Sequence, residues 1–97
     1  IVDGPIQSDF ALNKNLLQDR FPFSSLSNKK VNVLVFPNLD AANITYKLIK
    51  ELDEGLSIGP ILMGLCEPIH ILQLGASVSE IVNMSAVAVV DAQTKNK

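Results

Sequence analysis

The segment from Val31 to Asp40, VNVLVFPNLD, constrains the fold of this chain more than any other segment. Its first six residues are apolar on both faces apart from Asn32, which is typical of a central, parallel strand covered by helices on each side. Pro37 cannot donate a hydrogen bond to a strand ladder, and the Asp40 carboxylate can accept hydrogen bonds from the free amides of a helix start. The segment therefore predicts a strand that gives way to a helix within four residues.

The predicted helix covers residues 41–52. Its apolar stripe has the i, i+4, i+8 spacing and consists of Ile44, Leu48 and Leu52. Lys47, Lys50 and Glu51 are expected to face water. Gly55 is expected to close the helix.

The N-terminal part begins with a strand end at residues 1–2, followed by a turn at Asp3-Gly4-Pro5. A short helix is predicted over Phe10–Leu17, with Ser8 or Asp9 as its cap. Residues 19–30 mix Pro, Ser, Asn and charge without a period, so they predict a loop. The side chains expected to pin this loop to the core are Phe21, Phe23 and Leu26.

The C-terminal part contains two short apolar runs, residues 58–63 and 69–74, which predict two strands joined by a tight connection. Ser77 and Glu80 have the spacing of a capping box, so a helix is expected from there to about Ala92. The apolar face of this helix is expected to consist of Ile81, Val82, Ser85, Ala86 and Val89. The polar residues 93–97 are expected to fray.

Strands that alternate with helices predict an α/β fold with a mixed, mainly parallel sheet, layered as α/β/α. The length of 97 residues and an apolar content of 47% predict one domain over residues 1–97. Because no initiator Met is present and Ile1 begins a strand-like run, we expect a piece of a larger protein.

A net charge of -2, with acidic and basic residues scattered along the chain, offers no basic patch for nucleic acid or anionic lipid. No apolar run approaches the ~20 residues that span a bilayer. The single cysteine, Cys66, cannot form an internal disulfide, which favours a cytoplasmic location. No nucleic-acid or membrane partner is therefore expected.

Three features that resemble chemical sites have simpler explanations. Gly59 and Gly64 have the spacing of a phosphate loop, but Leu65-Cys66 replaces the required Lys-Ser/Thr. His70 lacks a second His or Cys at ligand spacing, so a packed, hydrogen-bonded histidine is favoured over a functional one. Cys66 has no basic neighbour, which favours a partly buried thiol over a nucleophile.

Four carboxylates lie at turns or helix starts, where they are expected to serve as caps or to interact with the helix dipole. They are Asp3, Asp9, Asp40 and Glu80. Phe21-Pro22-Phe23 is either a partner-binding anchor or a core contact, and the core contact is favoured.

Three segments together resemble the phosphate acetyl/butyryl transferase family: DGPIQSDFAL, VNVLVFPNLDAANITYK and GPILMGL. Gln73-Leu74-Gly75, FPFSSLS and Asp91-Ala92-Gln93 are more similar to the C-terminal phosphotransacetylase-like domain of bacterial NADP-dependent malic enzymes. The resemblance covers nearly the whole chain and implies the isocitrate dehydrogenase-like fold of phosphotransacetylases.

The same resemblance indicates where transfer chemistry is missing. Where phosphotransacetylases have a Ser-Arg pair at the acyl-CoA site, this chain has Gln73 and Leu74, and Glu80 stands in the acidic position. Leucine cannot hold an anion as the arginine fork does, and glutamine cannot replace a small hydroxyl donor. Acetyl transfer is therefore not expected.

The resemblance implies a non-catalytic regulatory or oligomer-forming part of a malic enzyme that converts malate to pyruvate and CO2 with NADP and Mg or Mn. No cofactor or metal is expected within these 97 residues. An acetyl-CoA effector site is expected at Gln73, Leu74, Gly75, Ala76, Glu80 and Asn43.

Other readings stay open from the sequence. The domain could only join subunits of a homo-oligomer, and it could also be an active phosphate acetyltransferase that moves acetyl between CoA and phosphate. A free-standing small-molecule-binding domain is a further alternative.

Overall fold

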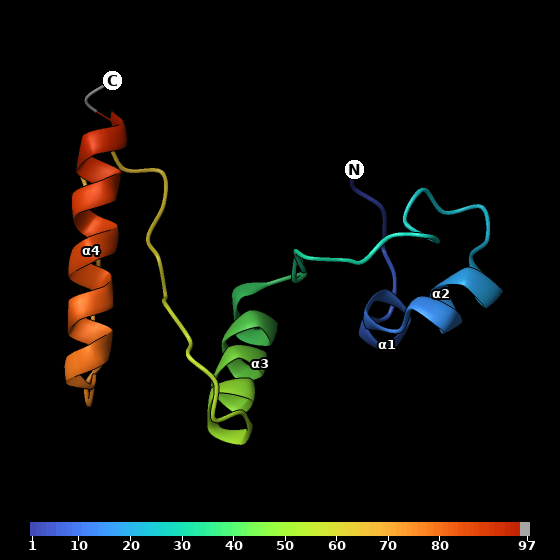
Figure 1. The fold of residues 1–97 in the computed structure, drawn as a ribbon, viewed down its shortest axis with the longest axis horizontal. Coiled ribbons are helices and arrows are strands. Elements are labelled where there is room, and N and C mark those ends of the chain that lie inside the picture. Colours follow the sequence, from blue (N-terminus) through green and yellow to red (C-terminus); the bar gives the residue numbers. More distant parts are fainter. Residues whose placement is uncertain (96–97) are drawn as a thin grey trace. The chain divides into compact units, whose positions relative to one another are not determined.

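The computed structural model describes residues 1–95, which form four helices joined by segments without strands (Figure 1). The helices are α1 (Ser8–Leu12), α2 (Lys14–Arg20), α3 (Leu39–Leu52) and α4 (Val78–Lys95). The chain divides into two compact units, Ile1–Thr45 and Tyr46–Lys97. Each unit is described by itself.

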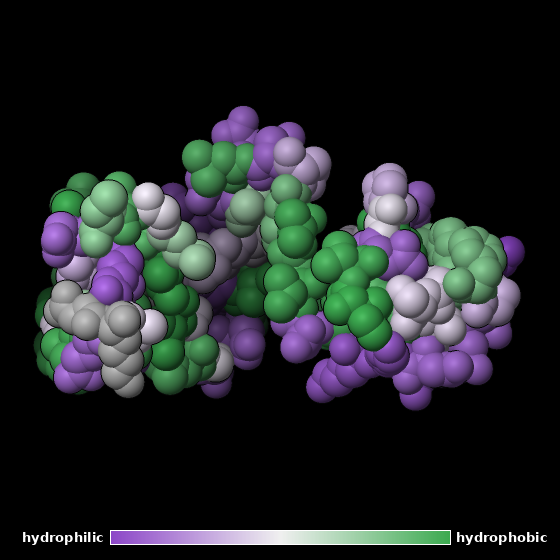
Figure 2. All heavy atoms as spheres, turned by 90° about the horizontal axis from the view of Figure 1, so that it is seen from above, coloured by the Kyte–Doolittle hydropathy of each residue, from purple (hydrophilic) through white to green (hydrophobic). Residues whose placement is uncertain are grey.

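The predicted α/β fold is wrong for this structure, because no strand or sheet occurs within residues 1–95. The three segments predicted as strands, residues 31–36, 58–63 and 69–74, form no ladder with one another. A strand needs the N–H and C=O groups of a neighbouring strand as partners, and an apolar pattern alone cannot supply them. Figure 2 shows the result as hydrophobic residues on the surface, and Val35 is 90% exposed.

The first unit is held by one buried leucine and a group of aromatic rings. Leu17 of α2 is 1% exposed. The rings of Phe10 and Phe21 meet edge to face with centroids 5.6 Å apart, and Phe21 meets Phe23 in the same way at 5.9 Å. Phe21 therefore pins the loop as predicted, whereas Phe23 is 83% exposed and is not a core residue.

Asn13 divides the helix that the sequence predicts over residues 10–17. Its side-chain Oδ1 accepts hydrogen bonds from the amides of Asn15 at 3.1 Å and Leu16 at 3.2 Å, so it caps α2. The cap of α1 is Gln7, which makes no side-chain capping hydrogen bond. The predicted cap by Ser8 or Asp9 is therefore wrong.

Asn38, rather than Asp40, caps α3. Asn38 Oδ1 accepts a hydrogen bond from the amide of Ala41 at 2.9 Å. Asp40 lies in the first turn of the helix, where its charge meets the positive end of the helix dipole. The helix begins two residues earlier than predicted and ends at Leu52, as predicted.

The apolar stripe predicted for α3 lies on its exposed side. Ile44, Leu48 and Leu52 are 69%, 56% and 77% exposed. Lys50, which was expected to face water, is half-buried together with Tyr46. The spacing of the stripe was correct, but the sequence does not show which face meets the rest of the unit.

The buried face of α4 differs from the face that the sequence predicts. Met84 is 6% exposed, and the half-buried residues around it follow helical spacing from Glu80 through Asn83 and Val87 to Asp91. The predicted apolar face is partly exposed, with Val82 at 60%. The helix continues to Lys95, so fraying is not seen at residues 93–95, and residues 96–97 lie outside the described part.

Candidate functional site

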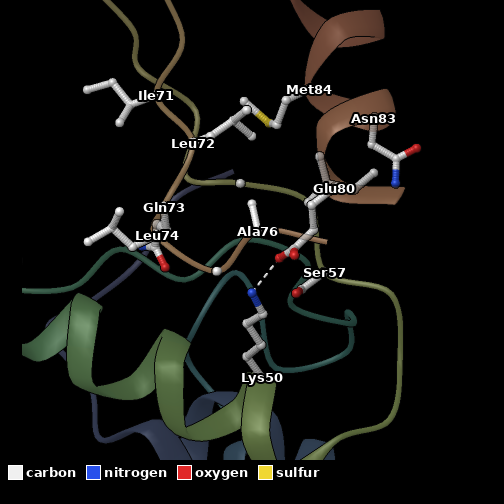
Figure 3. A pocket seen from close by; sticks show the side chains of 13 residues that line it. Lys50, Ser57, Ile71, Leu72, Gln73, Leu74, Ala76, Glu80, Asn83 and Met84 are labelled. Atoms are coloured by element: carbon white, nitrogen blue, oxygen red, sulfur yellow. Dashed lines mark hydrogen bonds and ion pairs between the residues drawn. The ribbon is translucent and has the colours of Figure 1, made fainter. Parts of the chain in front are cut away.

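A small cavity of about 40 Å³ lies in the second unit between the end of α3, the turn before α4 and the first turns of α4 (Figure 3). Its polar lining includes side chains from all three elements, and apolar side chains cover the rest. The residues that line this cavity include Lys50, Gln73, Leu74, Gly75, Ala76, Glu80 and Met84.

The turn at this cavity is built around Gly75. The amide of Ala76 donates to the carbonyl oxygen of Gln73 at 3.1 Å, and Gly75 has φ +82°. A positive φ at the third residue of a four-residue turn is the geometry of a type II β-turn, and glycine adopts it without steric cost. Leu74, the residue before it, is fully exposed. The turn therefore directs the side chain of Leu74 into solvent.

The capping box predicted from Ser77 and Glu80 is confirmed. The Ser77 amide donates to Glu80 Oε2 at 2.7 Å, and the Glu80 amide donates to Ser77 Oγ at 3.3 Å. The Ser77 hydroxyl also donates to Glu80 Oε2 at 2.9 Å. One carboxylate oxygen of Glu80, Oε2, therefore takes part in capping the N-terminus of α4.

The other carboxylate oxygen of Glu80 forms an ion pair with Lys50 Nζ (Figure 3). The Lys50 and Glu80 side chains are 34% and 21% exposed. The hydrogen bond from Lys50, followed by those from Ser77, lowers the pKa of Glu80 to about 2. The hydrogen bond to Glu80 raises the pKa of Lys50. Both groups are therefore charged near neutral pH.

Five of the six residues predicted for the effector site line this one cavity: Gln73, Leu74, Gly75, Ala76 and Glu80. Asn43 lies in the first unit and does not line the cavity. Whether these residues bind acetyl-CoA stays a prediction. Lys50 was missed, because a lysine at the end of an amphipathic helix is indistinguishable in sequence from a solvated surface charge.

A second polar cluster joins the last turns of α4 to the segment before the turn. His70 Nε2 lies 3.1 Å from Asp91 Oδ2, and the His70 side chain is 6% exposed. Lys95 Nζ lies 3.4 Å from the same oxygen and donates to the carbonyl oxygen of Leu65 at 2.8 Å. His70 is thus the packed, hydrogen-bonded histidine that the sequence favoured. Its Nδ1 is buried without a protein partner within the described residues.

An open apolar groove of about 630 Å³ lies beside this cluster, lined by residues 61–64 and by α4 residues such as Val87 and Val90. Cys66 is exposed, so the predicted partly buried thiol is wrong. Across residues 1–95, no group of three His, Cys, Asp or Glu side chains could hold a metal ion. No helix in the part that the structure describes has the length and apolar character that a membrane crossing requires.

Comparisons with known proteins show the family of the chain. Residues 1–89 match the family described as phosphate acetyl/butaryl transferase. The chain is 47% identical over 96 residues to an NADP-dependent malic enzyme of Escherichia coli, an alignment that covers 98% of this chain and 12% of that protein. It is also 47% identical over 90 residues to an NAD-dependent malic enzyme of Rhizobium meliloti, covering 93% of this chain and 12% of that enzyme.

Similarity extends to transferases. A phosphate acetyltransferase of Corynebacterium glutamicum is 40% identical over 91 residues, which cover 94% of this chain and 27% of that enzyme. The chain thus spans about one eighth of the length of the malic enzymes that it matches. Because the family match covers most of the chain, the chain belongs to the phosphate acetyl/butaryl transferase family.

Proposed function

We propose that this chain is a non-catalytic, regulatory and oligomer-forming part of a longer malic enzyme, and that it binds acetyl-CoA as an effector at the turn from Gln73 to Ala76. The observation that carries this proposal is Leu74. It stands where the family's transferases use an arginine, and its side chain is fully exposed. An aliphatic side chain in solvent can neither neutralise a phosphate nor stabilise a developing charge.

The cavity retains groups that can hold a ligand without transferring an acetyl group. Its apolar part, which includes Met84, offers a surface to a methyl group, and Lys50 offers a positive charge. The parent enzyme would oxidise malate with NADP and Mg or Mn bound elsewhere in its chain, in the cytoplasm. No step of that oxidation is assigned to the residues described above.

The regulatory role is tested with the full-length protein that contains this chain. Malate and NADP should yield NADPH, and acetyl-CoA should lower that rate and release or absorb heat on titration. The variant Gln73→Ala should change the acetyl-CoA concentration that gives half-inhibition by a larger factor than it changes the rate measured without acetyl-CoA. No NADPH production would rule out the malic-enzyme assignment, and no heat at millimolar acetyl-CoA would rule out the effector.

The alternative is an active phosphate acetyltransferase, favoured by the 40% identity to the Corynebacterium glutamicum enzyme. A coupled assay with acetyl phosphate and CoA separates the two. We expect no turnover above background, because Gln73 and Leu74 lack the hydroxyl and the guanidinium that transfer would use. Turnover would contradict this reading of both residues.

A further inference from the structure

The two oxygens of the Glu80 carboxylate have separate partners. Oε2 accepts hydrogen bonds from the amide and hydroxyl of Ser77, whereas Oε1 contacts Lys50 Nζ. Since the capping box uses only Oε2, the contact to Lys50 can open without removing the cap of α4. The ion pair and the helix start are therefore separable.

The cavity beneath this pair is too small for an effector. Its 40 Å³ has room for only a few water molecules. An acetyl thioester is several times larger, so a ligand can enter only if lining side chains move. Lys50 and Glu80 both line this cavity and join α3 to α4, and Figure 3 shows their charged ends meeting among the other lining side chains.

Lys50 is the one cationic side chain among the described residues that line the cavity. An anionic ligand therefore has a single positive side chain to meet there, and Glu80 already occupies it. We propose that Glu80 serves as an internal counter-ion and occupies the place that a ligand phosphate would take beside Lys50. When that phosphate displaces Glu80, Lys50 becomes the phosphate-binding residue.

This inference rests on the proposed effector function and deepens it. A phosphate group can exchange for the carboxylate because both are oxygen anions that accept from an ammonium, and the phosphate offers more charge. The apparent affinity then equals the intrinsic affinity multiplied by the fraction of molecules in which Lys50 is free. The pair thus sets the ligand concentration at which the site fills.

The test uses the full-length protein and four variants in calorimetric titrations with acetyl-CoA. Glu80→Gln is the decisive variant, because glutamine also serves in a capping box but carries no charge. Lys50→Met keeps much of the apolar stem without the ammonium, the double variant combines the two, and Lys47→Met is the matched control on the exposed side of α3.

We expect Glu80→Gln to bind acetyl-CoA about tenfold more tightly than the unchanged protein, and Lys50→Met to bind about tenfold more weakly. In the Lys50→Met background, Glu80→Gln should lose at least half of its tightening effect, since there is no ammonium left to release. Lys47→Met should stay within about twofold. Acetylpantetheine, which carries no phosphate, should bind Glu80→Gln no more tightly than the unchanged protein.

The outcomes separate this inference from the proposed function. If acetyl-CoA binds the unchanged protein but Glu80→Gln binds no more tightly, the counter-ion role is overturned and the effector site stands. If acetylpantetheine gains as much as acetyl-CoA from Glu80→Gln, the phosphate assignment is overturned. If only Glu80→Gln binds acetyl-CoA, the counter-ion role is supported, whereas the proposal that acetyl-CoA is an effector of the unchanged protein is overturned. Absence of binding in every protein overturns both proposals.

Discussion

Residues 1–45 contain a group of paired aromatic rings and the buried Leu17, whereas residues 46–95 are joined by ion pairs and hydrogen bonds between distant segments. Apolar packing does not depend on pH, and dissolved ions do not compete for its contacts. Polar links such as Lys50 with Glu80 depend on charge, so they respond to pH and to dissolved ions. The two units are therefore expected to respond differently to the same change: the second to charge and pH, and the first to loss of apolar volume.

The largest expected effect is in the first unit. Leu17→Ala should lower the free energy of unfolding of the cooperative unit that contains it by about 2–5 kcal/mol, because the site is fully buried and a cavity would remain. Denaturant unfolding of the full-length protein measures the change. Leu16→Ala, at a residue that is 36% exposed, is the control and should cost much less. Equal effects would mean that Leu17 is not the centre of this unit.

A smaller effect is expected from the histidine link of the second unit. His70→Ala should cost about 1–3 kcal/mol, because it removes a buried ring and the hydrogen bond to Asp91. Hydrogen exchange of the α4 amides should report the loss locally, with faster exchange near Asp91 than near Glu80. Cys66→Ser, at an exposed position of the same segment, should leave the exchange rates unchanged. Uniform exchange along α4 in His70→Ala would contradict this local link.

Helix capping in the first unit should contribute less. Asn13→Ala removes the side chain that accepts from the amides of Asn15 and Leu16, and the expected cost is about 1 kcal/mol. The melting temperature measures it, with Asn15→Ala as the control, since the Asn15 side chain is not the acceptor of these bonds. A larger shift in the control than in Asn13→Ala would show that the cap is not formed.

The smallest effect is expected from acid, and it sharpens the comparison within the second unit. The folded pKa of Glu80 is about 2, below its ordinary value of 4.5, so its contribution to stability is fully present above pH 4.5 and is lost as the pH falls toward 2. Asp3 has a lowered pKa in the first unit because of Ser24 and Gly4, so it acts in the same direction.

Acid titrations followed by circular dichroism can separate these two carboxylates. Glu80→Gln should flatten the loss of α4 helix between pH 4.5 and 2, because glutamine does not titrate. Asp3→Asn should leave this loss unchanged, since Asp3 holds Ser24 in the other unit. An α4 transition that is the same in Glu80→Gln and in the unchanged protein would show that the ion pair contributes nothing there.

Local signals in the sequence predicted part of the local structure, although the caps of α1 and α3 are Gln7 and Asn38 and not the predicted residues. The capping box of Ser77 and Glu80 was recognisable from four adjacent residues, because its hydrogen bonds close within the same segment. Five of the six residues that the family resemblance assigned to an effector site line one cavity, and ligand binding there stays a prediction.

Features that depend on distant partners were not predictable. The strand pattern of Val31–Phe36 is strong, but pairing requires another strand, and the described chain has none. The faces of α3 and α4 were assigned to the wrong side because periodicity gives the spacing of a stripe and not its partner. Lys50 was assigned to solvent for the same reason, as its partner Glu80 is thirty residues away.

The turn at Gly75 also sets the direction in which any side chain at position 74 leaves the backbone. The backbone there holds position 74 with its side chain outward, fully in water. The side chain of an arginine introduced at position 74 would leave the backbone in the same outward direction. A longer side chain at position 74 would therefore meet a ligand in the cavity only by folding back over the turn, or after the backbone of the turn had changed.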